Sequence, residues 1–261
     1  MNMDLNLKGK TVCITGGTAG IGLAAAKIYL AEGANVAICG RSKERLDQAL
    51  SNLRKISPNI FGLSVDAADA NALREFISRA AEHFGGLQIL VCNAGCGSGT
   101  PLTKTDKAEW DRVFDLNVCS VWEGVQASLP YLEKDGGSVV ITSSFQAKMP
   151  FTSTGIYAVS KAAVENMVQV LASELASKKI RVVAVRPGMI DTDLNAGLKA
   201  GYGEKALSVT MCMQRMGKPE EIANTIVFLS SDRSSYTTGV TVEVSGGKLV
   251  VQDPGYSYLS T

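Results

Sequence analysis

The chain has 261 residues, of which 46% are hydrophobic and 20% charged, so it is a globular protein of one large or two small domains rather than a disordered chain. Lys and Arg number 26 against 25 Asp and Glu, and the formal charge of +1 gives no electrostatic reason to expect nucleic acid or an anionic membrane as a partner. No apolar run reaches the roughly 18 residues that cross a bilayer, and the first ten residues lack a signal peptide's apolar core, so we expect a cytoplasmic protein with no membrane association.

Short apolar runs alternate with longer helical patterns along the whole chain. The expected strands are Thr11–Thr15, Val36–Cys39, Ile60–Val65, Ile89–Val91, Ser138–Thr142, Arg181–Val185 and Thr241–Val244. The expected helices are Gly20–Glu32, Arg45–Lys55, Ala70–Phe84, Lys107–Glu133, Gly155–Ala176 and Pro219–Ser230. Nearly continuous apolar strands separated by helices predict a parallel sheet covered on both faces. Because no linker or repeat interrupts the pattern, residues 1–261 are predicted to form a single doubly wound α/β domain.

The cysteines and the single histidine show no metal-binding pattern. Cys13, Cys39 and Cys92 fall in or beside predicted strands and are expected to be buried thiols. Cys92 and Cys96 have no second pair nearby, and His83 lies in a charged helical stretch. Zinc sites need clustered ligands and hydrolase triads need a placed histidine, so we expect neither a metal nor a triad.

A glycine-rich turn, residues 16–22 (GGTAGIG), follows the first predicted strand directly and leads into a helix. Glycines at such a turn let the backbone approach a pyrophosphate at the positive end of the helix. The spacing is G-x-x-x-G-x-G rather than the common G-x-G-x-x-G. The alternative for this turn taken alone, less favoured, is a tight strand–helix connection that binds nothing.

The end of the second predicted strand bears on the choice of cofactor. In NAD-binding folds an acidic residue here accepts from the ribose hydroxyls, whereas this chain has Gly40-Arg41-Ser42. Arg41 and Ser42 suit the 2′-phosphate of NADP, because a guanidinium binds phosphate through two hydrogen bonds. The alternative is that the basic residues only solvate a helix start, so NADP(H) is favoured and NAD(H) stays open.

Tyr157 and Lys161 are four residues apart in a helical pattern and therefore share one face of the helix. A free tyrosine titrates near ~10, and a neighbouring ammonium lowers that pKa toward the range useful for acid–base catalysis. We therefore expect Lys161 to lower the pKa of Tyr157. A surface Tyr–Lys pair without function is the plain alternative.

Three motifs taken together resemble the short-chain dehydrogenase/reductase family: Thr15–Gly22 (TGGTAGIG), Asn93-Ala94-Gly95 and Tyr157-x-x-x-Lys161. The resemblance extends from Leu7 to about Gly247 and implies a Rossmann-like, three-layer fold. It also implies a catalytic set of Asn117, Ser144, Tyr157 and Lys161. In that set Ser144 holds the substrate oxygen, Tyr157 is the general acid/base, and Asn117 shapes a helix kink and holds a water in the proton relay to Lys161. Ser143 would pack beside Ser144 or touch the cofactor.

The same resemblance implies a cofactor site along one edge of the sheet. Asp66 would lie beside the adenine, and Ile190 and Thr192 at the nicotinamide carboxamide. The expected members are Gly16, Thr18, Gly20, Ile21, Gly22, Arg41, Ser42, Asp66, Asn93, Ala94, Gly95, Tyr157, Lys161, Pro187, Gly188, Ile190 and Thr192. Gln88, Cys92 and Ser245 depart from residues common in the family, and none belongs to the catalytic set.

These features predict an oxidoreductase that transfers hydride between NADP(H) and a ketone/secondary alcohol pair, a carbonyl reductase or alcohol dehydrogenase. The Tyr-x-x-x-Lys spacing favours ketones over enoyl substrates. The first alternative is an NAD-dependent alcohol or sugar dehydrogenase on the same site. A nucleotide-binding regulator without turnover is the second, although such proteins typically lose the tyrosine or the lysine.

The substrate region and the assembly are also expectations. Residues 193–216 are predicted to form a lid over the substrate, with an apolar lining from Leu194, Leu198, Tyr202, Leu207, Met211, Met213 and Met216, unless these only pack helices. Phe145, Gln146, Met149 and Phe151 would add to the pocket wall and favour an apolar or aromatic ketone. The family usually pairs the helices here predicted at 107–133 and 155–176, which implies a homotetramer or homodimer. The tail at 252–261 would reach a neighbouring subunit or fray.

Overall fold

Seven parallel strands form one sheet in the order β3-β2-β1-β4-β5-β6-β7. The computed structural model describes residues 4–250. The strands are β1 (Thr11–Thr15), β2 (Asn35–Gly40), β3 (Ile60–Ser64), β4 (Ile89–Cys92), β5 (Gly137–Thr142), β6 (Ile180–Pro187) and β7 (Thr241–Val244). All seven predicted strands are confirmed, two of them with the predicted ends and the others with ends that differ by at most two residues. The strand order reverses between β1 and β4, so their carboxyl ends flank the topological switch point where doubly wound folds bind ligands.

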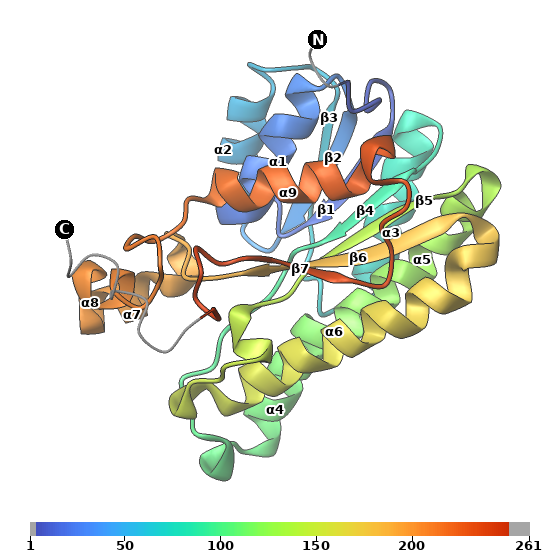
Figure 1. Cartoon of the computed structure of the whole chain (residues 1–261). Coiled ribbons are helices and arrows are strands. Elements are labelled where there is room, and N and C mark those ends of the chain that lie inside the picture. Colours follow the sequence, from blue (N-terminus) through green and yellow to red (C-terminus); the bar gives the residue numbers. More distant parts are fainter. Residues whose placement is uncertain (1–3, 251–261) are drawn as a thin grey trace.

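Helices cover both faces of the sheet, as Figure 1 shows. The helices on one face are α1 (Gly20–Ala31), α2 (Lys43–Leu53) and α9 (Pro219–Ser230), and those on the other are α3 (Ala70–Phe84), α5 (Ser120–Asp135) and α6 (Gly155–Leu175). Each face buries its own apolar core, for example Ile14 and Tyr29 on the first and Leu90 and Phe76 on the second. The predicted doubly wound, three-layer α/β domain is confirmed.

The predicted single helix from Lys107 to Glu133 is wrong. The chain forms α4 (Lys107–Phe114), then a π-helical turn at Asp115–Cys119, and then α5. A π-helical turn inserts an extra residue into the helical ladder, and such turns are frequent at functional sites. Periodicity alone does not reveal it, because the apolar spacing continues on both sides.

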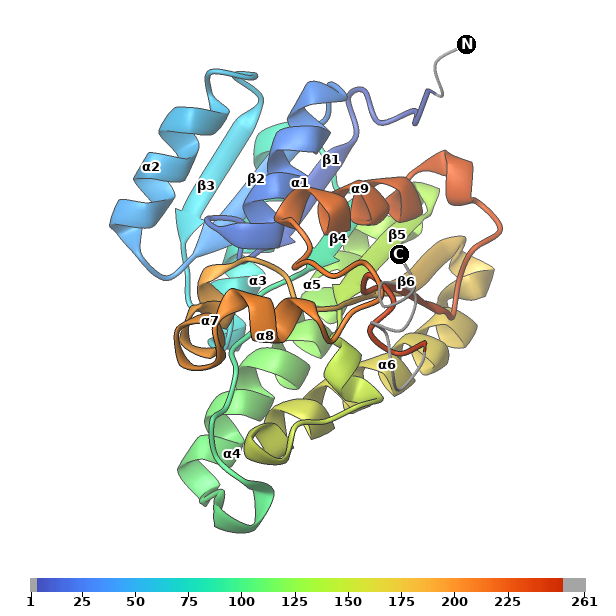
Figure 2. The same ribbon diagram turned by 60° about the vertical axis from the view of Figure 1, so that its left-hand side comes forward.

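Residues between β6 and α9 form two short helices, α7 (Ala196–Tyr202) and α8 (Glu204–Ser208). Figure 2 shows them as a separate small unit in front of the sheet. A third apolar cluster lies beneath this unit, in which Phe145 packs with Leu207, Met211 and Met216.

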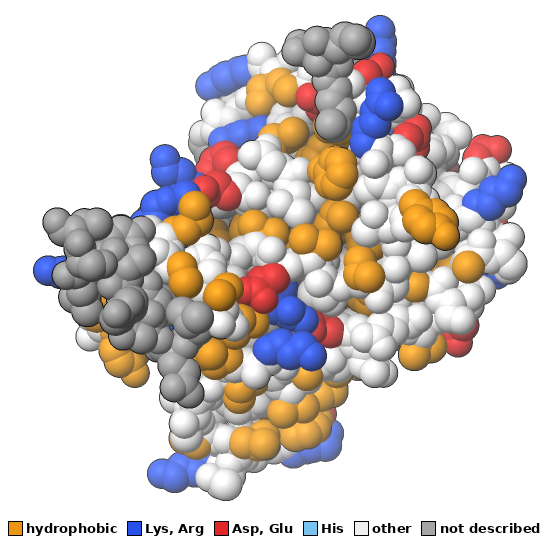
Figure 3. All heavy atoms as spheres, viewed as in Figure 1, with side chains coloured by type: hydrophobic (Ala, Val, Ile, Leu, Met, Phe, Trp, Pro, Cys, Tyr) orange, Lys and Arg blue, Asp and Glu red, His pale blue; other side chains and the backbone are white. Residues whose placement is uncertain are grey.

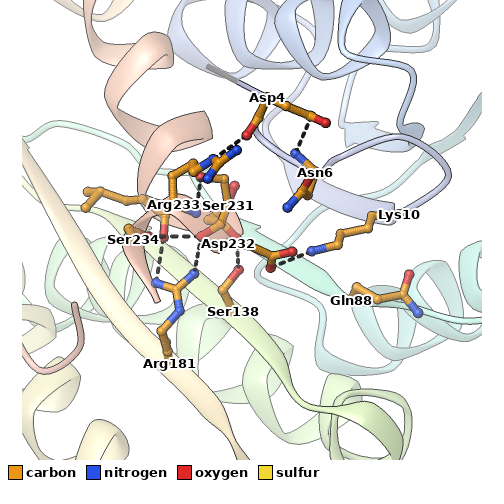
Figure 4. Close-up of polar contacts among 12 residues, drawn as sticks. Asp4, Asn6, Lys10, Gln88, Ser138, Arg181, Ser231, Asp232, Arg233 and Ser234 are labelled. Atoms are coloured by element: carbon orange, nitrogen blue, oxygen red, sulfur yellow. Dashed lines mark hydrogen bonds and ion pairs between the residues drawn. The ribbon is translucent and has the colours of Figure 1, made fainter. Parts of the chain in front are cut away.

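A polar network, drawn in Figure 4, lies at the amino ends of the strands. The Arg181 guanidinium donates to the carbonyls of Leu229 and Ser231, at 2.7 and 3.0 Å. Lys10 pairs with Asp232 at 2.7 Å. These contacts connect the start of β6 and the N-terminal segment to the end of α9. They lie at the opposite ends of the strands from the glycine-rich turn.

Charges of both signs are mixed over the face shown in Figure 3, in keeping with the near-zero net charge. Within residues 4–250, no helix combines the length and apolar character that crossing a membrane requires.

Candidate active site

An open cleft of about 640 Å³ lies at the carboxyl ends of the central strands. Its floor is built from residues that follow β1, β4, β5 and β6, because parallel strands bring their carboxyl ends to one edge. Of the predicted site residues, those on the cleft wall are Gly16, Gly20, Ile21, Asn93, Ala94, Gly95, Ser144, Tyr157, Lys161, Pro187, Gly188, Ile190 and Thr192. The cleft therefore unites segments that lie far apart in the sequence.

The glycine-rich turn is tight because side chains have no room in it. Gly16 and Gly20 adopt positive φ values of 66° and 52°, which favour glycine. A Cβ atom at Gly22 would lie 2.3 Å from the Gly16 carbonyl oxygen, so α1 packs directly under the turn. The residue before α1, Ala19, offers no side-chain cap, which leaves the first N–H groups of the helix available to an anion in the cleft.

Asn93 fastens the end of β4 to this turn. Its Nδ2 donates to the carbonyls of Thr15 and Gly16, at 3.2 and 3.1 Å. The Thr15 hydroxyl accepts in return from the backbone N–H groups of Asn93 and Ala94, both at 3.0 Å. Asn93 thus positions the turn as well as lining the cleft.

The residues after β2 lie outside the cleft wall, as do Thr18, Gly22, Asp66 and Asn117. Arg41 is exposed, and within residues 4–250 its guanidinium has no ion pair or hydrogen bond. Ser42 caps α2 by accepting from the Arg45 N–H at 3.2 Å, which is why this helix begins at Lys43 rather than at the predicted Arg45. The Ser42 hydroxyl also donates to Glu44 at 2.8 Å, so an acidic side chain lies near the end of β2.

All four side chains of the predicted catalytic set, Asn117, Ser144, Tyr157 and Lys161, are buried. Ser144 follows β5, while Tyr157 and Lys161 project from the first two turns of α6. The Lys161 ammonium donates to the Thr142 carbonyl at 2.9 Å and lies 5.8 Å from the centre of the Tyr157 ring. Their placement on one face of the helix is confirmed.

Asn117 lies within the π-helical turn and braces the wall behind Lys161. Its Oδ1 accepts from the Cys96 N–H at 2.8 Å, and its Nδ2 donates to the Cys96 carbonyl and to Ser160 Oγ, both at 3.0 Å. Every hydrogen bond of the amide therefore holds the loop after β4 against α6. The residue lies in the π-helical turn that separates α4 from α5.

The expected lowering of the Tyr157 pKa by Lys161 is wrong for this structure. Burial raises the pKa of Tyr157 above its ordinary value, and the nearby Ser144 hydroxyl offsets this only in part. Burial also lowers the pKa of Lys161 to about 8. The reason is geometric, because the ammonium is bonded to Thr142 and lies over the ring of Tyr157. A phenol whose pKa lies above its ordinary value is neutral at neutral pH and carries a proton that it can donate.

Ser143, beside Ser144, belongs to a buried polar chain that the sequence did not reveal. Its hydroxyl donates to Glu165 Oε1 at 2.7 Å. The Arg186 guanidinium donates to the same carboxylate through two bonds of 2.8 and 2.6 Å, and this pairing raises the pKa of Arg186. These hydrogen bonds connect α6 to β6 behind the end of β5.

Only some of the side chains predicted to line the cleft from residues 193–216 do so. Leu194 and Leu198 line the cleft, whereas Leu207, Met211 and Met216 are buried in the cluster beneath it, since they pack on Phe145. Tyr202 and Met213 are exposed and do not line the cleft, so the predicted methionine lining is wrong.

The predicted pocket wall after Ser144 is half correct. Phe145 and Gln146 line the cleft, while Met149, which is 43% exposed, and Phe151 do not. Sequence reasoning missed Gly97, Ser98 and Gly99 on the opposite wall, although they directly follow the Asn93-Ala94-Gly95 motif.

The cysteines follow their expected placement. Cys13, Cys39 and Cys92 are buried, and burial raises the pKa of Cys39 and Cys92 to about 12. In the described part of the chain, no three His, Cys, Asp or Glu side chains come together as metal ligands.

Known proteins of similar sequence identify the family of this chain. A family model described as enoyl-(acyl carrier protein) reductase matches residues 16–248. A 3α-hydroxysteroid dehydrogenase from Mediterraneibacter gnavus is 37% identical over 247 residues, which cover 94% of this chain and 98% of that protein. The chain belongs to the short-chain dehydrogenase/reductase family. The 3-oxoacyl-acyl-carrier-protein reductase FabG of Thermotoga maritima is 35% identical, covering 94% of this chain and 100% of that protein.

Solved structures of the family share this fold. A short-chain dehydrogenase/reductase from Brucella melitensis, described as a glucose/ribitol dehydrogenase, superposes with a TM-score of 0.89 at 32% identity over 95% of this chain and 100% of that one. As a family member, the chain is an NAD(P)-dependent oxidoreductase that acts on hydroxyl or carbonyl groups. The tight glycine turn, the uncapped start of α1 and the long cleft fit such a dinucleotide.

Proposed function

We propose that this protein is an NADP(H)-dependent carbonyl reductase that interconverts ketones and secondary alcohols. The observation that carries the proposal is the convergence of Ser144, Tyr157 and Lys161 on one wall of the cleft. The bound nicotinamide cofactor supplies the hydride in reduction and accepts it in oxidation. The four-residue spacing of Tyr157 and Lys161 supports ketones over the enoyl substrates named by the family model.

In this proposal Tyr157 is the general acid for reduction. Its phenol gives a proton to the carbonyl oxygen as negative charge develops there. Ser144, whose backbone leaves β5 toward the cleft, holds the same oxygen by a hydrogen bond. Lys161 lies over the Tyr157 ring and is fixed by the Thr142 carbonyl, and Asn117 holds the loop after β4 against α6 beside it.

The preference for NADP(H) rests on Arg41 at the end of β2. An exposed guanidinium that has no ion pair within residues 4–250 is available to the 2′-phosphate. Glu44 supports the second candidate, an NAD-dependent alcohol or sugar dehydrogenase. Its carboxylate holds the Ser42 hydroxyl and carries negative charge close to that position, because hydrogen bonds from the backbone and Ser42 lower its pKa.

Arg41→Ala decides between these cofactors. We expect affinity for NADPH to fall about 10- to 100-fold, because charge-assisted hydrogen bonds to phosphate are lost, while affinity for NADH stays unchanged. Calorimetric titration with both cofactors measures the difference. Lys55→Ala, which removes one positive charge just beyond the other end of α2, is the matched control and should change neither affinity. Tighter binding of NADH by the wild type, with no effect of Arg41→Ala, would establish the NAD-dependent alternative.

The substrate is covered by the lid at residues 193–216, whose Leu194 and Leu198 give an apolar wall to the cleft. An exposed ion pair between Arg45 and Asp193, at 3.0 Å, connects the start of this lid to α2. The apolar wall supports the preference for apolar ketones over small charged ones.

A homotetramer or homodimer is part of the proposal. Trp122 on α5 and Val159 and Val170 on α6 are exposed, and Figure 3 shows apolar side chains along the part of the surface where Figure 1 draws α6. Apolar residues left exposed on these helices support a subunit interface there. The predicted role of the tail at 252–261 lies outside the described residues. Light scattering measures the assembly, and a stable monomer would exclude this part of the proposal.

A further inference from the structure

The two walls of the substrate half of the cleft differ in chemistry. The lid contributes the aliphatic side chains of Leu194 and Leu198. The wall that follows β5 carries the amide of Gln146 and the hydroxyl of Thr154 instead. Both polar residues are more than nine-tenths buried, with 6% and 8% of their surface exposed, so their hydrogen bonding has energetic consequences.

One end of Gln146 is fixed next to the catalytic residues. Its backbone N–H donates to Ser144 Oγ at 3.2 Å, on the short 3-10 turn Phe145–Ala147. Its side-chain carbonyl accepts from the Thr154 hydroxyl, which lies one residue before α6 and three residues before Tyr157. Gln146 and Thr154 therefore form a clamp between the Ser144 turn and the start of the helix that carries Tyr157.

The other end of the Gln146 amide is not used within residues 4–250. Its Nε2 atom has no hydrogen-bond partner there, whereas every fully buried side-chain nitrogen or oxygen in the same residues has one. The Nε2 atom therefore retains access to the space around it, and the space that Gln146 lines is the cleft. The Nε2 of Gln146 thus remains available as a donor, in a residue whose side-chain carbonyl is held by Thr154 and whose backbone contacts Ser144 Oγ.

We propose that Gln146 is a specificity-determining residue that donates from Nε2 to a second oxygen atom of the substrate. This inference rests on the proposed carbonyl reductase function and narrows its substrate class. The preferred ketones carry a carbonyl, ester or hydroxyl oxygen close to the reacting carbonyl on the Gln146 side and an apolar group on the Leu194 side. Substrates without that oxygen leave the donor unpaired when the cleft closes, which costs transition-state binding.

The test compares ethyl 3-oxobutanoate, which has the second oxygen, with heptan-2-one, which does not. The measured quantity is the ratio of their kcat/KM values for the intact enzyme with NADPH. The two ketones differ in intrinsic reactivity, but this difference cancels when the ratio is compared between wild type and variant. In Gln146→Met, which keeps the length of the side chain and removes the donor, we expect the ratio to fall about tenfold or more. Gln146→Glu keeps an acceptor for Thr154 and replaces the donor by an acceptor, so the ratio should fall at least as far.

Thr154→Val is the control for the clamp. It removes the bond to Gln146 but leaves the amide in the cleft wall, so both kcat/KM values should fall together and their ratio should stay within about twofold of wild type. A ratio that is unchanged in Gln146→Met would overturn the inference while leaving the reductase function intact. Failure of the wild type to reduce either ketone, despite binding NADPH, would count against the proposed function itself.

Discussion

Tyr157→Phe is expected to lower kcat/KM for ketone reduction by about 10²- to 10⁴-fold, the range that general acid catalysis contributes. The substitution removes only the phenolic hydroxyl, so the ring stays packed under the Lys161 ammonium. Reduction needs a proton at the carbonyl oxygen, and burial keeps the pKa of Tyr157 high enough that the phenol is protonated at neutral pH. Affinity for the cofactor should fall far less than kcat/KM, because the glycine turn, Asn93 and the start of α1 are untouched and Tyr157 loses only its hydroxyl. Steady-state kinetics of NADPH oxidation and a binding titration measure the two quantities separately.

Tyr131→Phe is the matched control for this prediction. The Tyr131 hydroxyl donates to Ser78 at 3.3 Å, and the residue does not line the cleft. Its loss should leave kcat/KM unchanged. If Tyr157→Phe kept full activity, Tyr157 could not be the proton donor, and a water molecule or Ser144 would have to donate the proton instead.

Glu165→Ala is expected to lower the free energy of unfolding by about 3 kcal/mol, the lower end of the cost of breaking a buried ion pair, because it leaves the buried Arg186 guanidinium with only the more distant Glu243 carboxylate, 3.7 Å away. The Glu165 and Arg186 side chains are only 9% and 12% exposed and share two hydrogen bonds of 2.8 and 2.6 Å. The same substitution removes the acceptor of the Ser143 hydroxyl beside Ser144. Urea unfolding followed by circular dichroism measures the change.

Glu133→Ala provides the comparison at the surface. Its partner Lys178 is 2.5 Å away, but the two side chains are 38% and 42% exposed, so the loss should be about 0–1 kcal/mol. The double variant Glu165→Leu/Arg186→Met should regain much of the stability lost in Glu165→Ala, since it removes both charges of the buried pair. A cost of Glu165→Ala no larger than that of Glu133→Ala would show that Glu243 or water compensates the Arg186 charge fully.

The strands and most helices could be predicted from the sequence because their patterns are local. An apolar run such as Val36–Cys39 reports a strand buried on both faces wherever it pairs. The glycine turn was also readable, since Gly16, Gly20 and Gly22 are demanded by positive φ values or by backbone contact within a few residues. Motif order then indicated which residues meet at the sheet edge.

Features that depend on contacts between distant segments could not be read in this way. The π-helical turn at Asp115–Cys119 is held by bonds from Asn117 to Cys96, 21 residues earlier. The clamp between Gln146 and Thr154 and the pair between Glu165 and Arg186 likewise depend on how β5, α6 and β6 pack. The pKa of Tyr157 was mispredicted for the same reason, because four-residue spacing fixes the helix face but not the atom to which the Lys161 ammonium is bonded.

The most direct test of the proposed function follows the hydride itself. NADPH doubly deuterated at nicotinamide C4 would be incubated with the enzyme and ethyl 3-oxobutanoate, and the product analysed by mass spectrometry. We expect one deuterium on the carbinol carbon of the alcohol formed by wild type, and about 10²- to 10⁴-fold slower incorporation with Tyr157→Phe. Deuterium that stays entirely in the cofactor, for this ketone and for a wider set of ketones bound alongside NADPH, would contradict the reductase function.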